Sequence, residues 1–117
     1  MNYVVIAAHR SEYPAPITFA QGTLLDIGQR YEGDEHWEDW YLCSCHGQEP
    51  GWVPGQLIER LGVGRGRTVE AYSAHELDVD PGQLLEGLRP LNGWIWCRRA
   101  GNGELGWVPL AKLRLLD

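Results

Sequence analysis

Gly51-Trp52-Val53-Pro54 recurs 55 residues later as Gly106-Trp107-Val108-Pro109, and this repeat decides the fold of the chain. Two further stretches recur upstream in the same order. Trp40-Tyr41-Leu42-Cys43 corresponds to Trp94-Ile95-Trp96-Cys97, and Gly22 corresponds to Gly82. The separations are 54 residues at the Trp-Cys runs and 60 at the glycines, so the order of the segments is kept while the loops between them differ in length. Such collinear matches indicate an internal duplication.

Each copy has the pattern of a small all-β domain. Short apolar or alternating runs at residues 3–8, 23–31, 39–45 and 83–88 are bounded by Gly, Pro and charged residues, and no window shows a sustained helical period. We expect Gly22 and Gly82 to sit in tight turns, and Pro54 and Pro109 to end a strand and begin a 3₁₀ turn. The predicted domains are residues 1–60 and 68–117, joined by a linker at 61–67 in which Leu61 and Val63 pack.

Composition excludes several classes of function. The chain has 117 residues, 16 of them acidic and 10 Lys or Arg, and a formal net charge of −6, which argues against binding to nucleic acid or to an anionic membrane. No apolar run approaches the roughly 18–20 residues of a membrane span, and no basic segment precedes the run at 3–8. Three Cys do not make a disulfide framework. We therefore expect a cytoplasmic protein.

The order of the repeated segments resembles that of the Src homology 3 (SH3) domain, and the resemblance covers nearly the whole chain twice. SH3 sequences run from an Ala-Leu-Tyr-Asp-Tyr strand through a long loop to a turn glycine, a Trp-Trp pair and a Gly-(Trp/Tyr)-Val-Pro stretch. At the first strand the two copies offer Val5-Ile6-Ala7-Ala8-His9 and Thr68-Val69-Glu70-Ala71-Tyr72. The resemblance implies two SH3-like barrels in tandem, as in small stand-alone bacterial proteins made of two such domains.

The resemblance also implies which residues would line a binding groove. In the family, two Tyr of the first strand, the first Trp of the pair, the Pro after Trp-Val and a later Tyr hold a polyproline helix. Here Ala7, His9 and Leu57 replace all three Tyr in the first copy, and Glu70 and Lys112 replace two of them in the second, so each groove is partly eroded. We expect Trp40 and Trp94 to be exposed contact residues. The candidate ligand-binding residues are His9, Trp37, Trp40, Pro54, Leu57, Tyr72, Trp94 and Pro109.

The segment before Trp40 is strongly acidic. Residues 32–39 contain five acids and Trp37. The stretch up to Arg60 holds nine acids and three bases and the remainder seven of each, so the net charge falls in the first copy. Such a loop beside Trp side chains attracts basic segments by charge and cation–π contact, and a plain solvated loop is the alternative. The residues expected to steer a ligand are Asp34, Glu35, Glu38 and Asp39.

The sequence gives little support for metal binding or for catalysis. Cys43-Ser44-Cys45-His46 offers ligands that zinc favours, but its spacing differs from a C-x₂₋₄-C pattern and no second ligand pair accompanies it. Cys97 is the repeat partner of Cys43, which favours a small buried residue at both positions. The four His form no Ser-His-Asp or paired-carboxylate pattern. We expect no metal, no cofactor and no enzymatic activity.

The sequence thus favours a non-enzymatic protein- or peptide-binding module whose ligand is a basic or proline-containing segment. Two alternatives stay open. One is a structural unit that self-associates through its Trp surfaces, and the other is a barrel that binds cell-wall glycans. The sequence identifies neither the partner nor the oligomeric state.

Overall fold

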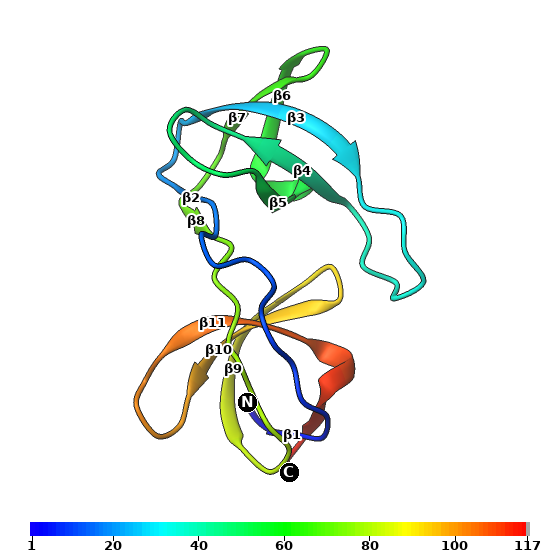
Figure 1. Ribbon diagram of the computed structural model, residues 1–117, viewed down its shortest axis with the longest axis vertical. Coiled ribbons are helices and arrows are strands. Elements are labelled where there is room, and N and C mark those ends of the chain that lie inside the picture. The colour runs from blue at the N-terminus through cyan, green and yellow to red at the C-terminus, as the bar shows by residue number, and fades with distance from the viewer. Residues whose placement is uncertain (117) are drawn as a thin grey trace. The chain divides into compact units, whose positions relative to one another are not determined.

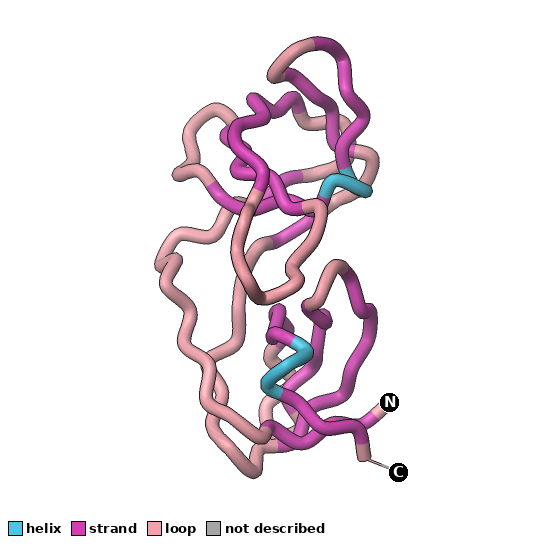
Figure 2. Tube along the Cα trace, turned by 90° about the vertical axis from the view of Figure 1, so that its right-hand side faces the viewer, coloured by secondary structure: helices cyan, strands magenta, loops and turns pink. Residues whose placement is uncertain are grey.

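The computed structural model describes residues 1–116 and is built of β-strands with two short 3₁₀ turns (Figures 1 and 2). The chain forms two compact units. Unit 1 contains Met1–Pro14 together with His75–Asp117, and unit 2 contains Ala15–Ala74. Within the described residues, no helix is long and apolar enough to cross a membrane.

Unit 1 is a five-stranded antiparallel sheet in the order β11-β10-β9-β1-β12. The N-terminal strand lies between β9 and the C-terminal strand, which Figure 1 shows as the blue strand beside yellow and red segments. Val5, Leu77, Leu85, Ile95 and Val108 belong to its buried core. The elements are β1 (Asn2–Val5), β9 (Leu84–Leu91), β10 (Trp94–Arg99), β11 (Leu105–Pro109), η2 (Leu110–Lys112) and β12 (Leu113–Leu115).

Unit 2 repeats this order as β5-β4-β3-β7-β6, with an additional two-stranded pair formed by β2 and β8. The buried side chains Ile17, Leu25, Cys43, Val53 and Leu57 form its interior. The elements are β2 (Thr18–Phe19), β3 (Leu24–Arg30), β4 (Trp40–Ser44), β5 (Gly51–Pro54), η1 (Gly55–Leu57), β6 (Ile58–Gly62), β7 (Arg65–Thr68) and β8 (Tyr72–Ser73). The molecule is therefore all-β, with two SH3-like small barrels.

Local expectations from the repeat hold in both units. Gly22 and Gly82 adopt φ of +84° and +93°, the left-handed conformation that glycine adopts without steric cost. Pro54 and Pro109 end β5 and β11, and each precedes a 3₁₀ turn, drawn in cyan in Figure 2. A proline has no N–H to extend the strand ladder, which explains why the strands stop there.

The first strands of the two sequence copies are exchanged. β1 belongs to the first copy, yet it pairs with β9 and β12 of the second. β7 opens the second copy, yet it pairs with β3 and β6 of the first. The registers are equivalent, because Tyr3 pairs with Leu85 as Gly66 pairs with Leu25. We call this arrangement the exchanged pairing.

The connection between the copies explains part of the exchange. β6 and β7 form a hairpin in which Gly62 pairs with Arg65, leaving only Val63 and Gly64 at the turn. Gly64 takes a φ of +71°, as a tight hairpin turn requires. In each sheet the strand in the first position of the repeat pairs with the strand in the last position, as β1 pairs with β12 and β7 with β6. The short turn therefore places β7 beside β6 in unit 2.

Two expectations about the connection are therefore wrong. The division of the chain does not follow residues 1–60 and 68–117, because residues 1–14 join unit 1 and residues 65–74 join unit 2. Residues 61–67 form the β6–β7 hairpin in place of a linker. Leu61 does not pack, since it is 47% exposed, and Val63 at the turn is fully exposed.

Candidate functional site

The exchange assembles a small aromatic cluster on unit 1. Trp94 opens β10 and its Cα pairs with that of Pro109 at the end of β11. His9 bridges to Val79, and its ring stands edge-on to Trp94 with the ring centroids 5.4 Å apart. Because His9 comes from the first copy and Trp94 from the second, neither copy supplies the arrangement alone. We call His9, Trp94 and Pro109 the Trp94 cluster.

A short hydrogen bond holds His9 in the cluster. His9 Nε2 lies 2.7 Å from Glu76 Oε1, with only 14% and 15% of the two side chains exposed. Glu76 is itself held by a parallel bridge to Trp107. The imidazole therefore has a fixed position between a carboxylate and the Trp94 ring.

Two further Trp extend this face of unit 1. Trp96 follows Trp94 by two positions and pairs with Trp107, and their rings meet edge to face at 5.2 Å. Trp107 is 6% exposed, whereas Trp94 and Trp96 are half-buried. Trp96 and Trp107 were not among the site residues predicted from the sequence. The two-residue period of a strand was the signal that could have included them, since it puts Trp96 on the side of Trp94.

The equivalent residues of unit 2 are more deeply buried. The Cα of Trp40 pairs with that of Pro54, and the hydroxyl of Tyr72 donates to the Trp52 carbonyl at 2.9 Å. Trp40 is 6% exposed and Tyr72 9%, and both Pro54 and Leu57 are buried. The expectation that Trp40 is exposed is therefore wrong, and Trp94 is half-buried.

The acidic segment is an ordered loop between β3 and β4, which we call the acidic loop (residues 32–39). Tyr31, at its start, packs against both Trp37 and Trp52, with ring centroids 5.5 Å and 5.3 Å away. The Tyr31 hydroxyl donates to Glu35 Oε1 at 2.8 Å. Sequence reasoning included Trp37 but missed Tyr31 and Trp52, which lie in separate segments and meet only in the folded unit.

The four expected steering residues do not share one environment. Asp34, Glu35 and Glu38 are exposed. Asp39 is half-buried and adopts a φ of +59°, and its carbonyl accepts the Gly55 N–H at 2.7 Å. Asp39 thus fixes the end of the acidic loop against η1. The other three carboxylates remain accessible to a ligand.

Comparison with known families decides the assignment of the chain. The model of the variant SH3 domain matches residues 3–61, just over half of the sequence. The chain belongs to the SH3 family. Domains of this family generally mediate protein–protein interactions and are generally non-catalytic. No curated protein and no solved structure matches the chain.

The matched SH3 sequence is divided between the two units. Residues 3–14 lie in unit 1 and residues 15–61 in unit 2. A contiguous SH3 sequence therefore does not form a contiguous barrel here. Its first strand completes the other barrel, and a strand from residues 65–68 takes its place.

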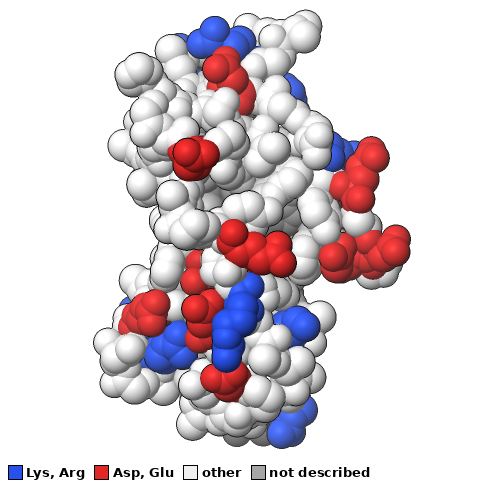
Figure 3. Space-filling model, in the orientation of Figure 1, with Lys and Arg blue, Asp and Glu red and all other residues white. Residues whose placement is uncertain are grey.

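The exchange also redistributes the charge between the SH3-like units. Unit 2 holds nine acidic and four basic residues, whereas unit 1 holds seven and six. Unit 2 thus has a net charge of −5 and unit 1 of −1. In Figure 3 acidic side chains gather over the β3–β4 loop at the right of the view, while red and blue are interspersed on unit 1.

Cys43 and Cys97 occupy equivalent core positions in the two units. Each pairs with the glycine that opens a Gly-Trp-Val-Pro stretch, and they are 1% and 0% exposed. Burial raises the pKa of each thiol to about 12. The prediction that both are buried is confirmed. Among the described residues, no group of three or more His, Cys, Asp or Glu is arranged to hold a metal ion.

Proposed function

We propose that the protein is a non-enzymatic binding module in which the Trp94 cluster receives a proline-containing peptide segment. The observation that supports this is the half-buried Trp94, with Pro109 directly opposite and His9 edge-on at 5.4 Å. Flat rings in fixed positions bind a preformed polyproline helix with little loss of conformational entropy. The hydrogen bond of His9 with Glu76 supplies the fixed position.

A titration tests this proposal. Peptides with Pro-x-x-Pro and flanking Lys or Arg are added to the full chain while the indole N–H signals of the Trp are followed by NMR. We expect the Trp94 signal to shift, and Trp94→Ala to weaken binding by about tenfold, as loss of a contact worth about 1–2 kcal/mol implies. Leu105→Ala is the matched control, because Leu105 is exposed at the opposite end of β11. Equal weakening by both variants contradicts the proposal.

A second surface, on unit 2, favours a basic segment. Trp37 is half-buried against Tyr31, and Asp34, Glu35 and Glu38 of the same acidic loop are exposed. A Lys or Arg over such rings gains about 0.5–1 kcal/mol at a partly exposed site. We infer that this surface draws a cationic stretch toward unit 2, with the attraction weakening as salt shortens the Debye length.

Neutralising the carboxylates of the acidic loop tests whether this surface attracts the ligand or whether the net negative charge of unit 2 is sufficient. Asp34→Asn, Glu35→Gln and Glu38→Gln are expected to slow association of an oligo-Arg peptide and flatten its salt dependence. The control removes the same charge elsewhere on unit 2 through Asp26→Asn, Glu49→Gln and Glu59→Gln. Identical association rates for both triple variants would assign the effect to net charge alone. If no peptide binds either unit, self-association measured by sedimentation tests the structural alternative.

A further inference from the structure

Side-chain size differs between the two units where the exchanged strands lie. Tyr3 on β1 and Gly66 on β7 hold equivalent places, since each pairs with a buried Leu. On the neighbouring strand, two residues beyond that Leu, stand Gly87 in unit 1 and Ile27 in unit 2. In unit 1 the large residue lies on the exchanged strand and the glycine on its neighbour, and in unit 2 the glycine lies on the exchanged strand and the large residue on its neighbour.

The contacts show that these sizes are matched. A Cβ on Gly87 would lie 2.6 Å from Tyr3 Cε2 and 2.7 Å from Ile95 Cδ1, so the Tyr3 ring and Ile95 together occupy the space that a side chain would need. A Cβ on Gly66 would lie 2.9 Å from Ile27 Cδ1 and 2.5 Å from Ile58 Cγ2. The opposite pairing would bring Tyr3 against Ile27 in one barrel and Gly66 against Gly87 in the other. The first overfills the core and the second leaves a void.

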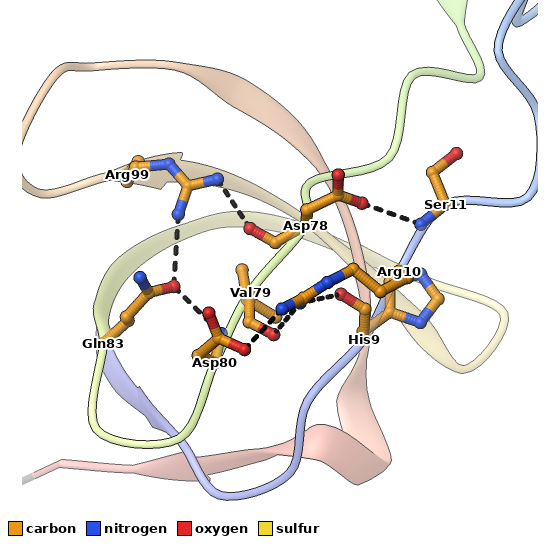
Figure 4. Close-up of polar contacts among 8 residues, drawn as sticks. All are labelled: His9, Arg10, Ser11, Asp78, Val79, Asp80, Gln83 and Arg99. Carbon is orange, nitrogen blue, oxygen red and sulfur yellow. Dashed lines mark hydrogen bonds and ion pairs between the residues drawn. The ribbon is translucent and has the colours of Figure 1, made fainter.

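Polar contacts also match the exchanged pairing (Figure 4). Arg10 donates to Asp80 Oδ1 at 2.6 Å and to the Val79 carbonyl at 2.8 Å. The Ser11 N–H donates to Asp78 Oδ1 at 2.8 Å. His9 pairs with Val79 in unit 1 as Tyr72 pairs with Phe19 in unit 2, so Val79 and Phe19 are equivalent. The residues on either side of Phe19, Thr18 and Ala20, are therefore the equivalents of Asp78 and Asp80. Those two residues offer no carboxylate to Arg10.

We propose that these side chains specify the exchanged pairing. The N-terminal segment that includes β1 has side chains whose size and charge fit β9 and the residues before it. β7 has the small side chain that fits β3. The short β6–β7 turn favours the same result, but it is not the only determinant. Because Arg10 and Asp80 are 57% and 56% exposed, the ion pair is the weaker contribution. The size match between the half-buried Tyr3, which packs against the core of unit 1, and Gly87 is the stronger.

Cysteine pairs in the full chain report which pairing forms. Asn2 is the partner of Glu86 in the exchanged pairing, and Asp26 holds the place of Glu86 in unit 2. One chain carries Asn2→Cys with Glu86→Cys and the other Asn2→Cys with Asp26→Cys, both with Cys45→Ser. Directly paired residues lie within disulfide reach. The sites are matched, because Glu86 and Asp26 each form one exposed ion pair with an Arg.

The turn is then lengthened by about twelve Gly and Ser residues at Val63, which span roughly 20 Å and free β7 to reach either barrel. With the natural side chains, we expect the 2–86 disulfide to form and the 2–26 disulfide to be minor. With Tyr3→Gly and Gly66→Tyr in the same long-turn chain, we expect the 2–26 disulfide to prevail. Comparable yields of both disulfides with the natural side chains, or persistence of 2–86 in the reversed chain, would overturn the proposal.

A double-mutant cycle keeps the proposal testable if the reversed chain does not fold. Gly87→Ala should lower the folding equilibrium constant at least tenfold in the natural chain but much less in a Tyr3→Ala background. Gly101→Ala is the control, since a Cβ there meets open space. If Gly87→Ala costs the same in both backgrounds, Tyr3 and Gly87 are not matched in size and the proposal fails.

Discussion

In each copy, one buried neighbour leaves no room for a larger residue in place of the glycine that opens the Gly-Trp-Val-Pro stretch. A Cβ on Gly51 would lie 2.9 Å from the Cβ of Ile17, and one on Gly106 would lie 2.9 Å from Leu77 Cγ. Both neighbours are fully buried, so they have little room to move. We expect Gly51→Ala to reduce the free energy of unfolding by about 1–3 kcal/mol in urea titrations. Gly101→Ala should leave it unchanged, and a similar loss there would contradict this reason.

The Cys97 thiol makes the free energy of unfolding depend on pH in the alkaline range. Its pKa is raised by burial to about 12 from 9 in the unfolded chain, so the folded state keeps the proton longer. This contribution is complete below pH 9 and is lost as the pH rises from about 9 to about 12, at up to about 1.4 kcal/mol per pH unit. We expect stability to fall over this window less steeply in Cys97→Ala than in the natural chain. Parallel curves for the two proteins would refute the assignment.

At the scale of elements, Arg10 joins the N-terminal segment to the residues before β9. It donates to the Val79 and His9 carbonyls as well as to Asp80, which also raises the pKa of the guanidinium. Arg10→Met should speed hydrogen exchange at the His9 and Val79 amides several-fold, since each donates to the other's carbonyl. Arg98→Met, which removes a comparably exposed ion pair with Glu86, should leave those two amides unaffected.

The elements were largely predictable from the sequence, and their pairing was not. Pro54, Pro109, Gly22 and Gly82 act locally, so their effect on strand ends and turns follows from residue type alone. The exchange depends on contacts such as Tyr3 with Gly87, whose partners are distant in sequence and meet only once the register is known. Trp40 was misjudged for a similar reason. A strand pattern gives the side on which a Trp lies, but not what covers it.

At the scale of the whole molecule, the exchange predicts which part of the chain folds alone. Residues 15–74 contain every strand of unit 2 without interruption, whereas residues 1–61 lack β7, which lies between β3 and β6. We expect the 15–74 fragment to unfold cooperatively and the 1–61 fragment to show weaker near-UV circular dichroism and faster amide exchange. Greater stability of 1–61 would show that the first copy completes its own barrel readily.

The arrangement on which the fold and the Trp94 cluster depend is the building of each barrel from both copies of the repeat. Nuclear Overhauser contacts of the His9 ring in the natural full-length chain test it most directly. The exchanged pairing predicts contacts between His9 and the Trp94 indole, whose ring centroids are 5.4 Å apart. Without exchange, His9 would take the place of Tyr72, whose ring centroid lies 5.5 Å from that of Phe19. Contacts of His9 with Phe19 in place of Trp94 would contradict the account.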